Sequence, residues 1–320
     1  MKGRLINMKA TREAFGNHLP LMGDKYDNIV ALDADLGKAT KIASFRELHP
    51  ERFFQMGIAE ANMIGVASGL SEYGYKVFLA SFGSFITGRY DIIRCSLAYS
   101  NRPVVIVGTH VGMAIGKDGV TQMGLEDVSI MRALPNMKIL NPASYSETIR
   151  VIEYLCETDL DSPHYLRLGR QPVEDIDIQF EFGKGQIVKE GTFKMKNITL
   201  FSTGCILSEV LEAVNLIEKN TAYSSIRVVH FPTLKPIDKD IIVKCAKETK
   251  HLFTVEDHSI VGGLGSAVSE VLTDEYPKKV VRIGLNDIFP ESAPPQDLYE
   301  KYGLSAGQIA KRVLSESLDK

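Results

Sequence analysis

Apolar and polar positions along the chain form two kinds of stretch that alternate. Residues 10–22 carry apolar side chains at helical spacing, and residues 28–35 form a nearly continuous apolar run that ends in Asp33 and Asp35. A short apolar run of this kind is typical of a parallel strand buried on both faces, with polar residues at its carboxyl end. The chain is therefore expected to begin with a helix followed by a buried strand.

The same alternation continues as far as residue 170. We expect further strands at 52–56, 76–82, 103–110, 138–141 and 164–168, and helices at 61–70, 84–99, 125–134 and 144–156. This order predicts an α/β fold with a doubly wound parallel sheet, in which ligands bind beyond the carboxyl ends of the strands. Polar segments follow three of the strands, and we expect them to lie close together at that edge: 33–40, 110–122 and 167–170.

The pattern changes between residues 171 and 196, where acidic residues and glycines replace the regular spacing. We interpret this stretch as a linker that ends in a short hairpin-like segment. A second alternating unit follows, with strands at 198–202, 226–231, 251–256 and 279–284 and helices at 205–219, 237–250, 265–272 and 306–314. A chain of 320 residues suits two domains, and we predict them at 1–185 and 186–320.

Composition excludes several classes of protein. The net charge is −3 with both signs interspersed, which argues against nucleic acid as a partner. No apolar run approaches the roughly 20 residues that a membrane span needs, and the N-terminus lacks the pattern of a signal peptide. The four cysteines are widely spaced and form no CxxC pair, so neither a zinc site nor a disulfide framework is indicated. We expect a cytoplasmic protein with no membrane partner.

Glu60 is a single carboxylate within a run of small and apolar residues, QMGIAEANMIGVASGL (55–70). It stands where the predicted short, buried strand 52–56 is followed by a helix rich in Gly, Ala and Ser. Acids are common in the first turn of a helix because they offset its dipole. A buried carboxylate here would instead have a perturbed pKa and be suited to hold or move a proton. The pattern alone favours the first interpretation.

The segment after the strand 103–110 is unusually polar and rich in glycine. We call residues 110–124 the polar loop; it contains His110, Lys117, Asp118, Thr121 and Gln122 between glycines. Long loops inside compact domains are usually functional, and glycines let a backbone approach a ligand closely. A mobile surface loop is the alternative. We favour a functional loop, because it follows a buried strand at the expected ligand edge.

Three other features have both a structural and a functional interpretation. Phe82 and Phe85 suit a hydrophobic core or a stacking wall for a planar ligand. The segment GGLGSA (262–267) lacks the lysine of a phosphate-binding loop, so we expect its glycines to allow close packing at the start of a helix. The Asp257-His258 pair suits a structural hydrogen bond better than a site. The sequence contains neither GxSxG nor HExxH.

Four segments together resemble the C-terminal half of a transketolase: GIAEANMIGVASGL, ASFGSFITGRYDIIR, THVGMAIGKDGVTQMGLED and TVEDHSIVGGLGSAV. They occur in the same order and at matching separations, and the resemblance extends from about residue 10 to residue 314. It implies a pyrimidine-binding domain followed by a transketolase C-terminal domain, with thiamine diphosphate as the cofactor.

The resemblance assigns cofactor-binding roles to three residues. Glu60 matches the catalytic glutamate that hydrogen-bonds the aminopyrimidine ring of the cofactor and takes part in proton transfer there. Phe82 and Phe85 match an aromatic wall around the same ring. A third aromatic of that wall aligns with Gly88, so that part of the wall is missing or is replaced by Arg89 or Tyr90.

The resemblance also implies a substrate site for sugar phosphates. His110, Arg170, Arg12 and Thr40 match residues that contact the substrate phosphate. Asp118 matches a residue that binds a sugar hydroxyl. Gln122 stands where bacterial and yeast members have a histidine and animal members a glutamine, and Lys117 replaces a usual acid. An exposed helix residue is the alternative for Arg12, and the register at Thr40 is loose.

One hallmark of thiamine diphosphate enzymes has no counterpart in this sequence. Those enzymes hold the diphosphate and the metal with a GDG motif followed by an asparagine, and neither 23–25 nor 117–119 qualifies. We therefore expect no metal ligands in this chain. A large partner subunit would carry the GDG domain with Mg²⁺ or Ca²⁺, and a homodimer of this chain would join two partners in a heterotetramer.

These inferences predict the small subunit of a split transketolase, which transfers a two-carbon ketol unit from a ketose phosphate to an aldose phosphate. The closest alternative is the beta subunit of a 2-oxo-acid dehydrogenase decarboxylase, which the polar loop disfavours. The corresponding half of a deoxyxylulose-phosphate-synthase-like protein shares the same glutamate. A non-catalytic assembly or regulatory module with this fold is the alternative from another class, and intact Glu60, His110 and Asp118 argue against it.

Overall fold

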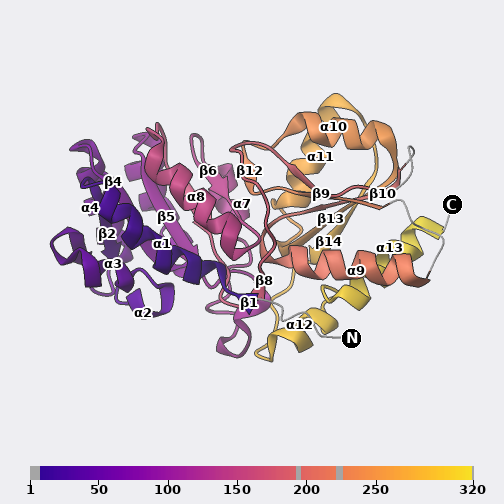
Figure 1. Ribbon diagram of the computed structural model, residues 1–320, viewed down its shortest axis with the longest axis horizontal. Coiled ribbons are helices and arrows are strands. Elements are labelled where there is room, and N and C mark those ends of the chain that lie inside the picture. The colour runs from indigo at the N-terminus through magenta and orange to yellow at the C-terminus, as the bar shows by residue number, and fades with distance from the viewer. Residues whose placement is uncertain (1–7, 192–195, 221–225, 319–320) are drawn as a thin grey trace.

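Two sheets of buried strands organise the chain, one in each half. The computed structural model describes residues 8–191, 196–220 and 226–318. The N-terminal half forms one α/β lobe and the C-terminal half a second lobe beside it (Figure 1). The predicted fold class is confirmed, whereas the boundary between residues 185 and 186 stays a prediction.

The first lobe is built on a seven-stranded sheet of order β12-β6-β7-β5-β4-β2-β3, parallel except for β12. Along β2, Ile29 and Ala31 pack into one hydrophobic cluster, and Val30 and Leu32 pack into another. Both faces are therefore covered, as the continuous apolar run predicts. The strands are β2 (Ile29–Asp33), β3 (Phe53–Gln55), β4 (Lys76–Phe82), β5 (Val104–Thr109), β6 (Lys138–Leu140), β7 (His164–Arg167) and β12 (Thr233–Lys235).

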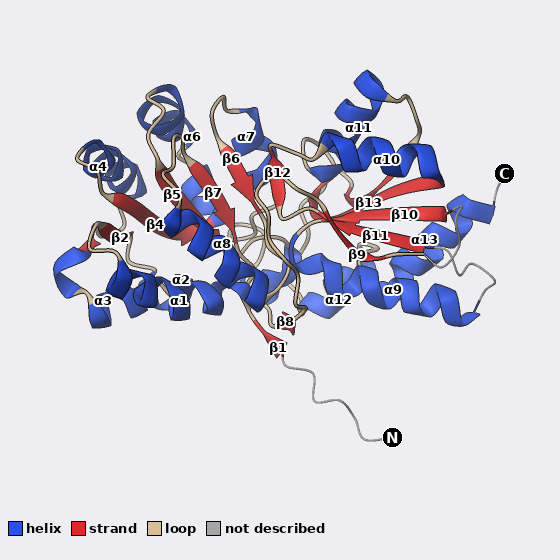
Figure 2. Ribbon diagram, turned by 45° about the horizontal axis from the view of Figure 1, so that its top comes forward, coloured by secondary structure: helices blue, strands red, loops and turns tan. Residues whose placement is uncertain are grey.

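Helices cover both faces of this sheet (Figure 2). They are α1 (Thr11–Lys25), α2 (Gly37–Thr40), α3 (Ala43–Leu48), η1 (Pro50–Arg52), α4 (Glu60–Glu72), α5 (Gly83–Thr87), α6 (Tyr90–Ile92), η2 (Ile93–Tyr99), η3 (Met113–Asp118), α7 (Asp127–Ala133) and α8 (Tyr145–Glu157). Helix α8 begins as its sequence predicts, because the Ser144 hydroxyl accepts a hydrogen bond from the Glu147 N–H at 3.2 Å. The Glu147 carboxylate accepts from the N–H of Ala143 rather than that of Ser144.

Two predicted elements of this lobe differ from the structure. The segment 52–56 is an edge strand, with Phe53 buried but Phe54 39% exposed, so the expectation of a buried strand is wrong beyond its first residue. The expected helix 84–99 is divided into α5, α6 and a π-helix, η2. It breaks at Arg89, whose φ of −95° and ψ of 40° are not helical.

The second lobe has a five-stranded sheet of order β14-β13-β10-β11-β9. Its strands are β9 (Gln186–Lys189), β10 (Lys196–Ser202), β11 (Ile226–His230), β13 (Thr249–Ser259) and β14 (Val280–Leu285), and its helices are η4 (Gly204–Ile206), α9 (Leu207–Asn220), α10 (Lys239–Glu248), α11 (Leu264–Glu275), α12 (Pro295–Lys301) and α13 (Ala306–Leu318). The expected hairpin at the end of the linker is wrong. Strand β9 instead pairs antiparallel with β11, and β8 (Val173–Glu174) pairs with β1 (Met8–Lys9).

The two lobes share packing and polar contacts. Strand β12 follows the first strands of the second lobe in sequence, yet it pairs with β6 of the first sheet. The His230 imidazole of β11 lies 3.0 Å from the Glu147 carboxylate of α8, and both side chains are fully buried. Within the described ranges, no helix combines the length and apolar character that a bilayer span requires.

Candidate active site

The three polar segments meet at the carboxyl edge of the first sheet, as expected. Arg12 of α1 connects two of them, because its Nη1 donates to the carbonyl of Ala39 at 2.7 Å and to His110 Nε2 at 3.0 Å. Arg170, beyond β7, donates to the carbonyl of Ile115 at 3.3 Å and to the Asp118 carboxylate at 2.5 Å. Arg12 and Arg170 therefore hold the strand ends and the polar loop together.

His110 is the first residue of the polar loop and is 3% exposed. Its φ of 58° turns the chain sharply away from β5, and its ring stacks on Phe82 with 3.8 Å between centroids. Arginine only donates hydrogen bonds, so Nε2 accepts from Arg12 and Nδ1 carries the proton. Nδ1 then donates to the Thr109 hydroxyl at 2.9 Å, which donates to the Ser81 carbonyl at 3.3 Å. The neutral imidazole thus has a defined tautomer.

Electrostatics keep this imidazole neutral. Burial, followed by the positive charges of Arg12 and Arg170, lowers the His110 pKa from 6.5 to about 3. Burial and the charge of Arg170 also lower the pKa of Arg12. Within the described part of the chain, the buried Arg12 Nε has no hydrogen-bond partner. Two guanidinium groups beside a neutral histidine, with one N–H unpaired, suit an oxyanion such as a phosphate.

The remaining predicted substrate residues differ in placement. Asp118 is exposed and paired with Arg170, so its carboxylate lies at the entrance to this cluster. Gln122 is partly exposed, and its N–H donates to the carbonyl of Gly119 at 3.1 Å. Thr40 is fully buried, and its hydroxyl donates to the carbonyl of Leu36, the residue before α2, at 3.1 Å. The structure therefore brings Arg12, His110, Asp118 and Arg170 together, but it uses the Thr40 hydroxyl at the start of its own helix.

Glu60 is the first residue of α4 and is 6% exposed. It is placed to offset the helix dipole, and it is also a buried carboxylate. Its partner is Arg89, whose Nη2 lies 3.4 Å from the carboxylate and whose side chain is 48% exposed. Arg89 directly follows Gly88 in the chain, and the next residue, Tyr90, is 36% exposed.

Phe82 and Phe85 form a stacked pair with 5.3 Å between centroids and 22° between planes. Phe82 is buried at the end of β4, and Phe85 is half-buried in α5. The His110 ring also stacks on Phe82, so the three rings form one aromatic row. A buried carboxylate and an aromatic row at a strand end suit a planar nitrogen heterocycle, because the rings offer stacking and the carboxylate accepts a hydrogen bond.

The glycine-rich segment 262–267 is filled by the protein itself, as expected for close packing. The Glu256 carboxylate accepts from the N–H groups of Leu264 and Gly265 at 2.7 and 2.8 Å, and burial raises its pKa to about 7. Asp257 accepts from the Met113 N–H of the polar loop, in line with a structural role. The described residues contain no group of three or more His, Cys, Asp or Glu side chains arranged to hold a metal ion.

The sequence did not indicate two of these features. Glu60 and Arg89 are 29 residues apart in the chain, and their contact depends on the break between α5 and α6. The arrangement around the polar loop depends on Arg167, which bonds Asp127, Gly124 and the carbonyl of Asp257. The only sign of this role in the sequence was that Arg167, a basic residue, stands near the end of the predicted buried strand 164–168.

Two family models match this chain in succession. The model for the transketolase pyrimidine-binding domain matches residues 7–175, and the model for the transketolase C-terminal domain matches residues 183–309.

Similar proteins have the same extent. The chain is 42% identical over 315 residues to a putative transketolase C-terminal section of Methanocaldococcus jannaschii, with 96% of each covered. It is 35% identical to the 6-deoxy-6-sulfo-D-fructose transketolase subunit SqwH of a Clostridium species, over 94% of this chain and 92% of that one. A solved structure described as a split gene transketolase, inactive beta4 tetramer, is 43% identical with a TM-score of 0.86 and 97% of its chain covered. By contrast, this chain covers 48% of each of two curated transketolases that it also matches.

Proposed function

The chain belongs to the transketolase family, and we propose that it acts as the small subunit of a split transketolase that transfers a two-carbon ketol unit between sugar phosphates. The observation that carries this proposal is the match to a split-gene transketolase at 43% identity over 97% of that chain. The match covers 96% of this chain and 97% of that one, and the buried Glu60 and the stacked Phe82 and Phe85 would supply a site for the family's chemistry.

Three residues of this chain would hold the pyrimidine ring of thiamine diphosphate. Glu60 would accept a hydrogen bond from a ring nitrogen and hold or move the proton there. Phe82 and Phe85, which stack on each other, would stack against the ring and exclude water from it. The cofactor, when bound, supplies the carbanion chemistry of ketol transfer, and the protein orients and tunes it.

Four residues would bind the sugar phosphate. Arg12 and Arg170 offer guanidinium groups to the phosphate, and the unpaired Arg12 Nε supports this role. The neutral His110 borders the phosphate pocket and, through Nε2, holds the Arg12 guanidinium that would face the phosphate. Asp118, at the pocket entrance, accepts from a sugar hydroxyl. Gln122 and Lys117 lie on the same loop, where they would meet the acceptor sugar.

The partner is a separate large subunit that carries the diphosphate-binding GDG domain and holds Mg²⁺ or Ca²⁺. A homodimer of this chain joins two such subunits in a cytoplasmic heterotetramer. One solved relative is described as an inactive beta4 tetramer, which supports the expectation that a chain of this kind assembles alone but needs a partner for activity.

A substrate panel separates this function from its alternatives. This chain is mixed with the partner subunit, thiamine diphosphate and Mg²⁺ and offered ketose and aldose phosphates, pyruvate, or pyruvate with glyceraldehyde phosphate. We expect ketol transfer between pentose phosphates. Decarboxylation of pyruvate without ketol transfer would favour the dehydrogenase, and condensation of pyruvate with the aldose phosphate would favour the synthase. No turnover with any of these would favour the assembly module.

A further inference from the structure

The polar loop is held by both lobes of the molecule. From the first lobe, Gln171 Nε2 donates to the carbonyl of Ala114 at 2.7 Å, and Arg170 donates to that of Ile115. From the second lobe, Asp257 at the end of β13 accepts from the Met113 N–H at 2.9 Å. The loop therefore bridges the lobes between His110 and Asp118.

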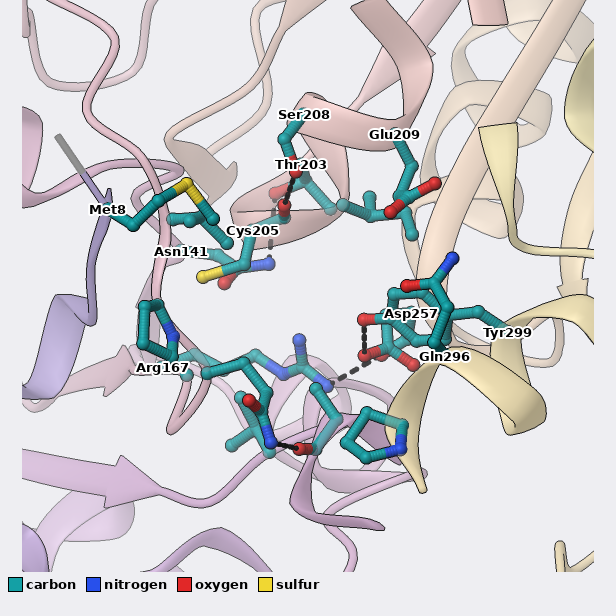
Figure 3. Close-up of a pocket in the computed structure, with 18 of the residues that line it drawn as sticks. Met8, Asn141, Arg167, Thr203, Cys205, Ser208, Glu209, Asp257, Gln296 and Tyr299 are labelled. Atoms are coloured by element: carbon teal, nitrogen blue, oxygen red, sulfur yellow. Dashed lines mark hydrogen bonds between the residues drawn. The ribbon is translucent and has the colours of Figure 1, made fainter. Parts of the chain in front are cut away.

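Tyr299 of α12 orients the Asp257 carboxylate. Its hydroxyl donates to Asp257 Oδ2 at 2.8 Å, while Oδ1 accepts from Met113. Arg167 Nη2 donates to the Asp257 carbonyl at 3.0 Å, so this residue is held at its backbone as well (Figure 3). The carboxylate is almost fully buried, and its place between Tyr299 and the loop leaves little freedom for either oxygen.

Glycines allow the loop to approach the second lobe this closely. A Cβ on Gly112 would lie 2.1 Å from Asp257 Oδ2, and one on Gly116 would lie 2.8 Å from Pro295 Cδ. Both glycines have φ of 72°, a conformation that other residues rarely adopt. The loop's conformation is thus matched to Asp257 and to the start of α12.

Apolar side chains anchor this part of the loop as well, because Met113, Ala114 and Ile115 are buried in the same hydrophobic cluster as Tyr299. A cavity of about 360 Å³ lies between the lobes, lined among others by Ala114, Asp257 and Tyr299. Figure 3 shows Arg167 and Asp257 at the side of this space opposite Thr203 and Cys205. On the side of Ala114 that lines this cavity, packed neighbours are lacking, so there the hydrogen bonds of Asp257 add to the apolar packing that holds the loop.

We propose that Asp257 and Tyr299 of the C-terminal domain are positioning residues for the substrate site, because they set the place of the polar loop that carries His110 and Asp118. The expected effect of Asp257 and Tyr299 on catalysis rests on the proposed function. Their expected effect on the position of the polar loop does not. These residues give the C-terminal domain a role in the active site beyond assembly. Neither residue touches the reacting atoms in this proposal.

Tyr299→Phe tests the proposal, with Tyr302→Phe as the matched control. Both variants remove a hydroxyl that donates to a carboxylate near the end of α12, but the partner of Tyr302 is the exposed Glu291. In this chain alone, Tyr299→Phe should speed hydrogen exchange of amides 112–118 by about fivefold, the factor expected for the loss of one hydrogen bond. Tyr302→Phe should leave this exchange unchanged.

The reconstituted enzyme provides the second measurement. Tyr299→Phe should raise KM for the sugar phosphates by about fivefold and change kcat by less than about twofold, because the loop is displaced and the cofactor site is intact. Asp257→Asn keeps one oxygen that can accept from the Met113 N–H. Its KM should therefore lie between that of the wild type and that of Asp257→Ala. Unchanged exchange and KM in Tyr299→Phe would overturn the proposal. If the wild type shows no ketol transfer, the proposed function fails, and hydrogen exchange alone decides the role of Tyr299.

Discussion

At the scale of single residues, burial and partners decide what Glu60 and His110 are able to do. Glu60 has both the helix-start position and the buried carboxylate that its sequence context offered as alternatives. A buried carboxylate costs free energy unless it is paired, and Arg89 is too exposed to compensate fully. A site that retains such a group is consistent with a role in proton transfer rather than stability.

Glu60→Gln should abolish most of the activity without unfolding the chain. Glutamine keeps the size and one acceptor but does not take up a proton, so we expect ketol transfer to fall by about 100-fold or more in the reconstituted enzyme. Sedimentation should show unchanged assembly. Glu72→Gln on the same helix, which removes an exposed pair with Arg102, should retain activity within about twofold. Equal activity in both variants would return Glu60 to a role in offsetting the helix dipole.

His110 should remain neutral near pH 6 in this chain without substrate. Its pKa of about 3 in the folded chain lies below the usual 6.5, so the unfolded chain binds more protons between these values. His110 therefore lowers the free energy of unfolding as the pH falls from 6.5 toward 3, by about 2 kcal/mol between pH 6.5 and pH 5.

Two measurements check this prediction. Nuclear magnetic resonance of labelled histidines should show a neutral ring with the proton on Nδ1 at pH 6, with His110→Asn used to assign the signal. In denaturant titrations, His110→Asn should lose less stability than the wild type between pH 6.5 and pH 5. A His110 signal that titrates near pH 6.5 would contradict the account.

At the scale of elements, the sequence predicted a helix or strand correctly where the hydrophobic period and the length of the stretch indicated the same kind of element. Strand β4 has the predicted limits, because its buried apolar run begins at the polar Lys76 and ends where Gly83 and Ser84 follow Phe82. The helix expected at 84–99 failed because its apolar spacing does not reveal the break at Arg89. Strands β9 and β12 have only four and three residues and pair with strands distant in sequence. Local patterns contain no information about such pairing.

Gly112→Ala should destabilise the chain through the polar loop. Gly112 has a φ of 72° and a ψ of −173°, a region that essentially only glycine occupies, and its Cβ would meet Asp257. We expect the free energy of unfolding to fall by about 1–3 kcal/mol. Gly307→Ala is the control, since no atom lies within 4 Å of its Cβ. Equal thermal stability of the two variants would show that the loop adopts another conformation.

At the scale of the whole molecule, the carboxyl edge of the first sheet was predictable and the contacts between lobes were not. The carboxyl ends of parallel strands lie at the same edge of a sheet in any strand order. The meeting of the polar segments around Arg12 could therefore be expected from the alternation of strands and helices alone. The bond from Met113 to Asp257 joins residues 144 positions apart. It depends on how two separately formed sheets pack, which no periodicity encodes. The resemblance to transketolases indicated the candidate site residues. The structure added the hydrogen-bond partners of Arg12, His110, Asp118 and Arg170.

The requirement for two chains tests the account most directly. Ketol transfer between pentose phosphates is measured, with thiamine diphosphate and Mg²⁺ present, for this chain alone, for the partner subunit alone and for their mixture. The account predicts no turnover from either chain alone and activity in the mixture that reaches its maximum at equal molar amounts. Full activity from this chain alone would contradict it, since the chain would then have to hold both ends of the cofactor itself.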